Sequence, residues 1–139
     1  MGKLPEEQAK KIFRQMVKIV KYLHLQKICH RDLKAENFLF SGKDNDHIVL
    51  IDFGLSYQWE NNMEEELIIY GANKILGTAY YIAPEVLQKR YDERCDIWSL
   101  GALLHIITTA TAPFMGDGDM EIIENVKKNN YNRSKPTFM

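Results

Sequence analysis

The side chains best suited to chemistry lie in two short segments, residues 30–37 (HRDLKAEN) and residues 52–54 (DFG). The oxygens of Asn37 and Asp52 are hard ligands of the kind that magnesium prefers. Taken singly, these residues have ordinary explanations, because an aspartate beside an arginine is usually a surface ion pair worth about 1 kcal/mol or less. A lone Asp-Phe-Gly is usually a turn. Their order, followed by Ala-Pro-Glu at residues 83–85, is one that independent turns would rarely produce, so a single catalytic arrangement is the stronger interpretation.

A β-hairpin is predicted between the two segments. Residues 38–40 (FLF) and 48–51 (IVLI) are short apolar runs, and the polar residues 41–46 (SGKDND) between them supply turn chemistry. Asn37 comes directly before the first strand, and Asp52 directly follows the second. The hairpin would therefore bring these two side chains to the same end.

Three helices are predicted around the hairpin, which gives a mainly α fold with a small β-hairpin. The first begins at Pro5, where two glutamates follow at its positive end, and runs to about His24. Its apolar positions are Ile12, Phe13, Met16, Val17, Ile19, Val20, Leu23 and Leu25. Residues 97–110 are apolar nearly all round and predict a core helix, and residues 120–128 predict a third helix.

These features together resemble the catalytic domain of a serine/threonine protein kinase. Residues 30–37 resemble its catalytic loop, residues 52–54 its metal-binding turn, and residues 77–87 (GTAYYIAPEVL) the end of its activation segment, where substrates dock. Residues 96–101 (DIWSLG) are similar to the start of its central buried helix. The finer resemblance is to the calcium/calmodulin-dependent kinase group, especially the calcium-dependent kinases of plants and protists. It implies that residues 1–139 are a partial kinase domain, a C-terminal large lobe truncated at both ends.

The resemblance implies ATP and Mg²⁺ as cofactors and proteins phosphorylated on Ser or Thr as substrates. Asp32 would orient the substrate hydroxyl and accept its proton, and Lys34 would contact the transferring phosphate. Asn37 and Asp52 would bind the metal, and Leu39 would form the apolar floor of the adenine site. The implied nucleotide-binding residues are Lys34, Glu36, Asn37, Leu39 and Asp52.

The resemblance also assigns residues to activation. Arg31 would gather a phosphate on the activation segment, and the candidate acceptors are Tyr70 and, less well, Thr78. The acidic residues 64–66 offer permanent negative charge. We therefore hypothesise that this segment, which is expected to be mobile and to carry an insertion, needs no phosphorylation.

Four further residues are expected to support the site, and a fifth, Glu85, to stabilise the fold. His30 and Phe53 would stack into an apolar column. Asp96 would hold the catalytic loop by accepting backbone N–H bonds, because a buried carboxylate without such bonds is costly. Thr78 would brace Asp32 and Lys34. Glu85 would pair, in the family, with an arginine of a C-terminal portion outside this chain, so lower stability is expected here.

Two functions remain open. The first is a part of an active kinase that is inactive when this chain stands alone. It is expected to be inactive because no glycine-rich loop or strand lysine can be placed before residue 30. The alternative is a non-catalytic binding or scaffold module derived from a kinase. Calcium or calmodulin-type regulation would act through regions not in this chain. A truncated lobe would also expose apolar surface, so self-association is expected.

Composition excludes several classes of partner. Apolar residues make up 45% of the 139 residues and charged residues 27%, and the net charge of −1 gives no electrostatic reason to bind nucleic acid. No apolar run is long enough to span a membrane. Cys29, expected at a helix end, and Cys95, expected in a charged turn, are interpreted as free thiols of a reducing compartment rather than a bridge or metal site. A cytoplasmic protein is expected.

Overall fold

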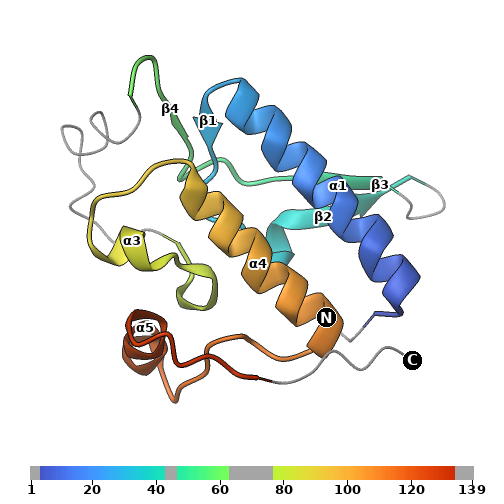
Figure 1. The fold of residues 1–139 in the computed structure, drawn as a ribbon. Coiled ribbons are helices and arrows are strands. Elements are labelled where there is room, and N and C mark those ends of the chain that lie inside the picture. Colours follow the sequence, from blue (N-terminus) through green and yellow to red (C-terminus); the bar gives the residue numbers. More distant parts are fainter. Residues whose placement is uncertain (1–3, 43–46, 63–76, 134–139) are drawn as a thin grey trace.

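The computed structural model describes residues 4–42, 47–62 and 77–133, and helices dominate this part of the chain (Figure 1). The helices are α1 (Glu6–Leu25), α3 (Pro84–Leu87), α4 (Arg94–Thr109) and α5 (Asp119–Lys127), with 3-10 turns at Ala35–Asn37 and Ala79–Tyr81. The strands are β1 (Ile28–Cys29), β2 (Phe38–Ser41), β3 (His47–Leu50) and β4 (Tyr57–Gln58). A mainly helical fold with a small hairpin is confirmed within these ranges.

Helix α1 begins and ends within one residue of the prediction. Pro5 precedes its first turn with φ −55°, and the acidic Glu6 and Glu7 lie at the end where the helix dipole is positive. The side chains buried from this helix are Ala9, Ile12, Met16, Val20 and Leu23. The predicted apolar face included residues that are not buried, because Val17 is 40% and Leu25 70% exposed.

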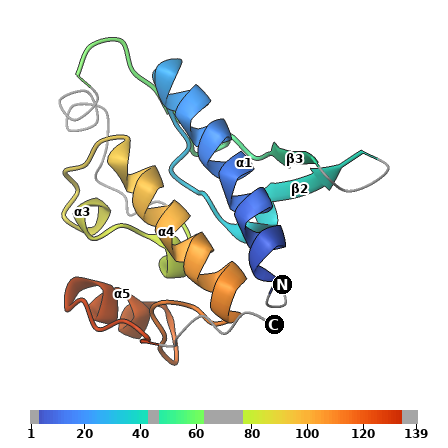
Figure 2. The ribbon, with the colours of Figure 1, turned by 45° about the vertical axis from the view of Figure 1, so that its right-hand side comes forward.

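Helix α4 lies beside α1 and runs in the opposite direction (Figures 1 and 2). The amide of Leu4 donates to the carbonyl of Ile107 at one end of the pair, at 3.1 Å. Leu100 and Leu103 of α4 pack into one core cluster with the buried face of α1. The expectation that α4 is buried all round is wrong, because Ile97 is 53% and Leu104 38% exposed. The neighbours of α4 cover part of its circumference, and Ile97 and Leu104 lie on the parts that they leave open.

The predicted hairpin is present as the antiparallel pair β2–β3. Its register pairs Phe38 with Leu50 and Leu39 with Val49. Phe38 and Leu50 are buried in the core below, while Leu39 and Val49 are 47% and 46% exposed. Alternate side chains of a strand point to opposite faces, so the hairpin has one face in the core and one face open.

A second antiparallel pair, β1–β4, was not predicted. It pairs Ile28 with Gln58 and Cys29 with Tyr57, so part of the segment expected to be an irregular loop after residue 56 is a strand. Two-residue strands carry too little alternation to be recognised in sequence. This strand pair fixes the position where residues 30–37 begin, because residue 30 directly follows β1.

Helix α5 lies on the side of α4 that faces away from α1 (Figure 2). It buries Ile122 and Val126 in a cluster with Ala79 and Phe114. The ring of Phe114 stacks on that of Trp98 from α4, with centroids 5.7 Å apart. The predicted third helix is confirmed, one residue earlier than expected. Among the described residues, no helix combines the length and the apolar character that a membrane span requires.

Candidate active site

Asp32 lies in the loop after β1 and is 9% exposed. Its Oδ2 accepts a hydrogen bond from Lys34 Nζ at 2.8 Å, and its Oδ1 accepts one from Thr78 Oγ1 at 3.2 Å. Two donors from separate segments therefore fix the carboxylate. The hydrogen bond to Asp32 is the main cause that raises the pKa of Lys34, and the charges of Asp32, Asp52 and Glu36 act in the same direction. Lys34 is thus a cation within electrostatic reach of three carboxylates.

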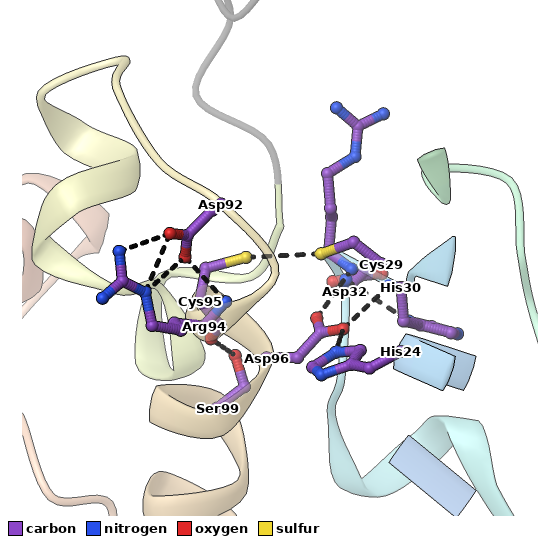
Figure 3. A network of polar contacts seen from close by, with 10 residues as sticks. His24, Cys29, His30, Asp32, Asp92, Arg94, Cys95, Asp96 and Ser99 are labelled. Atoms are coloured by element: carbon purple, nitrogen blue, oxygen red, sulfur yellow. Dashed lines mark hydrogen bonds and ion pairs between the residues drawn. The ribbon is translucent and has the colours of Figure 1, made fainter. Parts of the chain in front are cut away.

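The loop that carries Asp32 is held by Asp96, at the start of α4 (Figure 3). The fully buried Asp96 carboxylate accepts the backbone N–H of His30 at Oδ2 and that of Arg31 at Oδ1, both at 2.9 Å. The expected backbone bonds to Asp96 are confirmed. His24 Nε2, from the last turn of α1, lies 2.9 Å from Oδ2. One carboxylate therefore joins α1, α4 and the loop.

Asn37 and Asp52 lie at the same end of the hairpin, as predicted. The amide N–H of Ile51 donates to the carbonyl of Asn37 at 2.9 Å, across the end of the hairpin. Asn37 Nδ2 donates to the backbone carbonyl of Asp32 at 2.9 Å, which leaves its amide oxygen as the atom able to bind a cation. Asp52 is exposed and has φ 62°, and its Oδ1 accepts the N–H of Gly54 at 3.2 Å. An exposed carboxylate and an amide oxygen fit a hard cation such as magnesium.

His30 and Phe53 contact each other, as expected. Their ring centroids are 5.0 Å apart with an interplanar angle of 67°, an edge-to-face arrangement. His30 Nδ1 accepts the N–H of Asp32 at 3.4 Å, and Nε2 lies 3.2 Å from the carbonyl oxygen of Ile51. A neutral ring protonated at Nε2 satisfies both contacts. His30 thereby connects the Asp32 loop to the residue before Asp52.

Arg31 connects the same loop to β4 and to the segment before α4. It has φ 65°, its Nε donates to the carbonyl of Leu55 at 2.6 Å, and its Nη1 donates to Tyr91 Oη at 3.4 Å. The guanidinium lies 5.5 Å from the centroid of the Tyr57 ring. The phosphate that Arg31 was predicted to gather stays a prediction, because Tyr70 and residues 64–66 lie outside the described residues.

The predicted nucleotide residues Glu36 and Leu39 are both exposed, Glu36 in the 3-10 turn before the hairpin and Leu39 in β2. Leu39 sits opposite Val49 on the exposed face of the hairpin. Phe53 is also 46% exposed. Apolar side chains on this face suit an aromatic ring. The role of each residue in nucleotide binding stays a prediction.

Thr78 and Glu85 have different surroundings. Thr78 contacts Asp32 as predicted, through its hydroxyl. Glu85, in the first turn of α3, lines a cavity of about 400 Å³ together with Arg90 and Arg94. The expectation that Glu85 lacks its family partner stays a prediction.

Sequence reasoning did not recognise His24, Gly77 or Ser99. Gly77 has φ +103°, and a Cβ there would lie 3.0 Å from the carbonyl oxygen of Arg31. The hydroxyl of Ser99 donates to the carbonyl of Tyr81 at 2.8 Å. Gly77 could have been found as the glycine before Thr78, but the contacts of His24 and Ser99 join residues far apart in sequence. No local pattern signals such contacts.

The comparison with protein families matches residues 1–137 to the protein kinase domain. The chain is 42% identical over 132 residues to calcium-dependent protein kinase 3 of Plasmodium yoelii yoelii, covering 94% of this chain and 23% of that protein. It is 37% identical over 137 residues to calcium-dependent protein kinase 4 of Plasmodium berghei (strain Anka), covering 96% and 24%.

A plant relative is similar to the same degree. The chain is 42% identical over 128 residues to calcium/calmodulin-dependent serine/threonine-protein kinase 1 of Oryza sativa subsp. japonica, covering 91% of this chain and 20% of that protein. The chain therefore spans about a quarter or less of the length of these curated relatives. Since the family match extends over nearly every residue, including the loop held by Asp96, the chain belongs to the protein kinase domain family.

Proposed function

We propose that this chain is the large, helical lobe of a serine/threonine protein kinase, which transfers the γ-phosphate of ATP to hydroxyl groups of proteins. The observation that carries the proposal is the Asp32 carboxylate, bonded by Lys34 at one oxygen and by Thr78 at the other. A carboxylate fixed in this way can orient a hydroxyl group, and positioning is most of what phosphoryl transfer requires of a protein.

Asp32 accepts a hydrogen bond from the substrate hydroxyl and takes its proton as the new P–O bond forms. Lys34 places its positive charge on the oxygens of the transferring phosphate. Asn37 and Asp52 would hold magnesium, which would neutralise negative charge on the nucleotide phosphates. Leu39 would contact the adenine ring from the exposed face of the hairpin. Glu36, which lies within electrostatic reach of Lys34, would be part of the nucleotide-binding site.

The chain by itself is proposed to be inactive. The 139 residues contain no glycine-rich loop followed by a strand lysine, and a kinase uses both to hold the phosphates of ATP. The calcium dependence that the relatives' names state would act through segments outside these residues. A cytoplasmic location is part of the proposal, because both cysteines are free.

The experiment measures transfer of labelled phosphate from ATP to serine and threonine peptides by the protein encoded by the full reading frame. Asp32→Asn removes the proton acceptor but keeps the shape of the side chain, so kcat should fall by about 10²–10⁴-fold. Asp92→Asn, which removes the charge that Asp92 pairs with Arg94 just before α4, is the matched control and should leave kcat unchanged.

A second measurement separates metal binding from catalysis. Asp52→Asn should weaken magnesium-nucleotide binding in isothermal titration calorimetry while the melting temperature stays near that of the wild type, because Asp52 is exposed. Unchanged binding would count against the metal assignment. Full activity of the Asp32→Asn variant would refute the kinase mechanism, and an inactive full-length wild type would favour the non-catalytic module.

A further inference from the structure

The sequence holds two cysteines, and the fold brings their sulfur atoms into contact (Figure 3). Cys29 Sγ lies 3.6 Å from Cys95 Sγ, although the residues are 66 positions apart. Cys29 is 0% and Cys95 4% exposed. The sequence-based placements were both wrong, because Cys29 is in β1 and Cys95 is in the first turn of α4. The interpretation as free thiols holds for the state described.

The two thiols lie next to the contacts that hold the Asp32 loop. Cys29 precedes His30 in the chain, and Cys95 precedes Asp96. The hydrogen bond between the His30 amide and the Asp96 carboxylate therefore joins the residues that directly follow the two cysteines. A covalent bond between the sulfurs would form a second link between the same two segments.

A metal site explains this arrangement less well. Cys29, Cys95 and Asp96 place their ligand atoms within 4.8 Å of one another. Structural zinc sites use four ligands, and both oxygens of Asp96 already accept hydrogen bonds from His30 and Arg31. A metal would have to break the contacts that position the loop. The two sulfurs are the atoms left available, and two thiols in contact suit disulfide formation.

We propose that Cys29 and Cys95 are a reversible redox modification site, at which a peroxide converts the two thiols into an intramolecular disulfide. One sulfur attacks the peroxide, breaks the O–O bond and becomes a sulfenic acid, with release of water. The second sulfur then attacks the sulfenic sulfur, forms the S–S bond and releases another water. In sum, two thiols and one hydrogen peroxide give one disulfide and two waters. A small dithiol reverses the reaction by exchange.

Access favours Cys95 as the sulfur that is oxidised first. Cys95 lines a cavity of about 10 Å³ that also borders Gly77 and Thr78, which is close to the space that one water molecule needs. A peroxide is only slightly larger. Burial is the main cause that raises the pKa of Cys29 well above its usual value. The thiolate is the nucleophile, so this raised pKa slows the second step, in which Cys29 attacks the sulfenic sulfur of Cys95. Both steps are expected to be slow.

Oxidation should also loosen the hold on the Asp32 loop. The sulfurs must approach from 3.6 Å to the disulfide length of about 2.05 Å, so β1 and the start of α4 must shift relative to each other. The amides of His30 and Arg31 lie in that region and are held by Asp96 at 2.9 Å. A resulting loss of phosphotransfer rests on the proposed function, whereas the disulfide itself does not.

The experiment treats the purified, reduced chain with hydrogen peroxide under native conditions and measures intact mass and alkylatable thiols. We expect a loss of the mass of two hydrogens in the monomer, loss of both alkylatable thiols, and recovery of both with dithiothreitol. Peptide mapping should give one cross-linked pair that contains Cys29 and Cys95. With two cysteines in the sequence, no other intramolecular disulfide can produce this mass.

Controls make the result specific to the fold. Cys29→Ser and Cys95→Ser should each retain one thiol or form sulfenic acid, without the loss of two hydrogens. The wild type in urea should form the intramolecular disulfide more slowly, because the folded contact is gone. Hydrogen exchange at the His30 and Arg31 amides should speed up after oxidation.

Two thiols that stay alkylatable in the native wild type, cross-links that form only between chains, or an equal rate in urea would overturn the proposal. The readouts on the wild type do not require the variants to fold. They also do not require phosphotransfer, so failure here is distinguishable from failure of the proposed function.

Discussion

At the scale of single residues, the Asp96 carboxylate contributes most to the order of the site. It is fully buried, and it accepts two backbone N–H bonds from the loop that carries Asp32. Hydrogen bonds to a charged acceptor are stronger than those between neutral groups, and an unpaired buried donor is costly. The position of Asp32 therefore depends on a side chain from another element.

Asp96→Asn should destabilise the chain. The variant places an amide NH₂ opposite a backbone N–H, so at least one buried donor loses its acceptor, at a cost of about 1–3 kcal/mol in unfolding free energy. Urea denaturation at neutral pH measures the change. Asp92→Asn is the control. It removes the ion pair with the 78%-exposed side chain of Arg94, worth about 1 kcal/mol or less, and keeps the Oδ1 that accepts the Arg94 backbone N–H. Equal losses in the two variants would contradict this prediction.

At the scale of elements, glycine stabilises the turn before Thr78 but destabilises helix α4. Gly77 has φ +103° and lies against the carbonyl oxygen of Arg31, so it permits the close approach of two segments. Gly101 lies in α4, where an added Cβ would meet nothing within 4 Å. One glycine is required by its backbone conformation, and the other weakens a helix.

The matched pair Gly77→Ala and Gly101→Ala tests this difference. Gly77→Ala should lower the unfolding free energy by about 1–3 kcal/mol, because it strains the backbone and places Cβ 3.0 Å from the Arg31 oxygen. Gly101→Ala should raise it by about 0.5–1 kcal/mol through helix propensity. Both are measured by urea denaturation. Changes of the same sign would show that the assignment of the two positions is wrong.

Helix α4 also carries a pH-dependent contribution to stability. Burial lowers the pKa of His105 below its usual value of 6.5, so the folded state resists protonation. The contribution is complete above the unfolded pKa, and it is lost as pH falls from about 6.5 through the folded pKa. His105→Gln should therefore reduce the drop in unfolding free energy between neutral pH and about pH 5, as measured by urea denaturation at several pH values. An unchanged slope would contradict this.

At the scale of the whole molecule, apolar surface remains uncovered between α1 and α4. Val17, Leu25 and Ile97 are 40%, 70% and 53% exposed and line a cavity of about 310 Å³. Uncovered apolar patches favour association, which the sequence also led us to expect. This face is distant in the fold from Met120, a residue of α5 that is 77% exposed.

Self-association should therefore be concentration-dependent and sensitive to this face. Ile97→Lys should shift the mass measured by size-exclusion chromatography with light scattering toward the monomer, because a charge would be desolvated at the contact. Met120→Lys is the control for a change of the same type elsewhere and should leave the association unchanged. A strict monomer for the wild type at high concentration would disprove the prediction.

Much of the fold follows from local patterns. The spacing of apolar residues placed α1, α4 and α5 to within a few residues, and the turn chemistry of residues 41–46 placed the β2–β3 hairpin. Periodicity did not show which side of a helix is covered. Val17, Leu25 and Ile97 were therefore assigned to buried faces, although they are exposed. Whether a helix face is buried depends on which other elements pack against it, and local sequence does not specify those elements.

The amino-acid order by itself determined the family, and it predicted Asp32, Asn37 and Asp52 as site residues without coordinates, because the segments that carry them stand in a fixed order. It also predicted that Asp96 holds the loop, but only the tertiary structure decided which amides it holds and what else meets there. Asp96 reaches the amides of His30 and Arg31, His24 reaches Asp96, and Cys29 meets Cys95. Each of these contacts joins segments more than 60 residues apart. Sequence spacing constrains the residues within one element, whereas contacts between elements arise when packing brings their buried faces together.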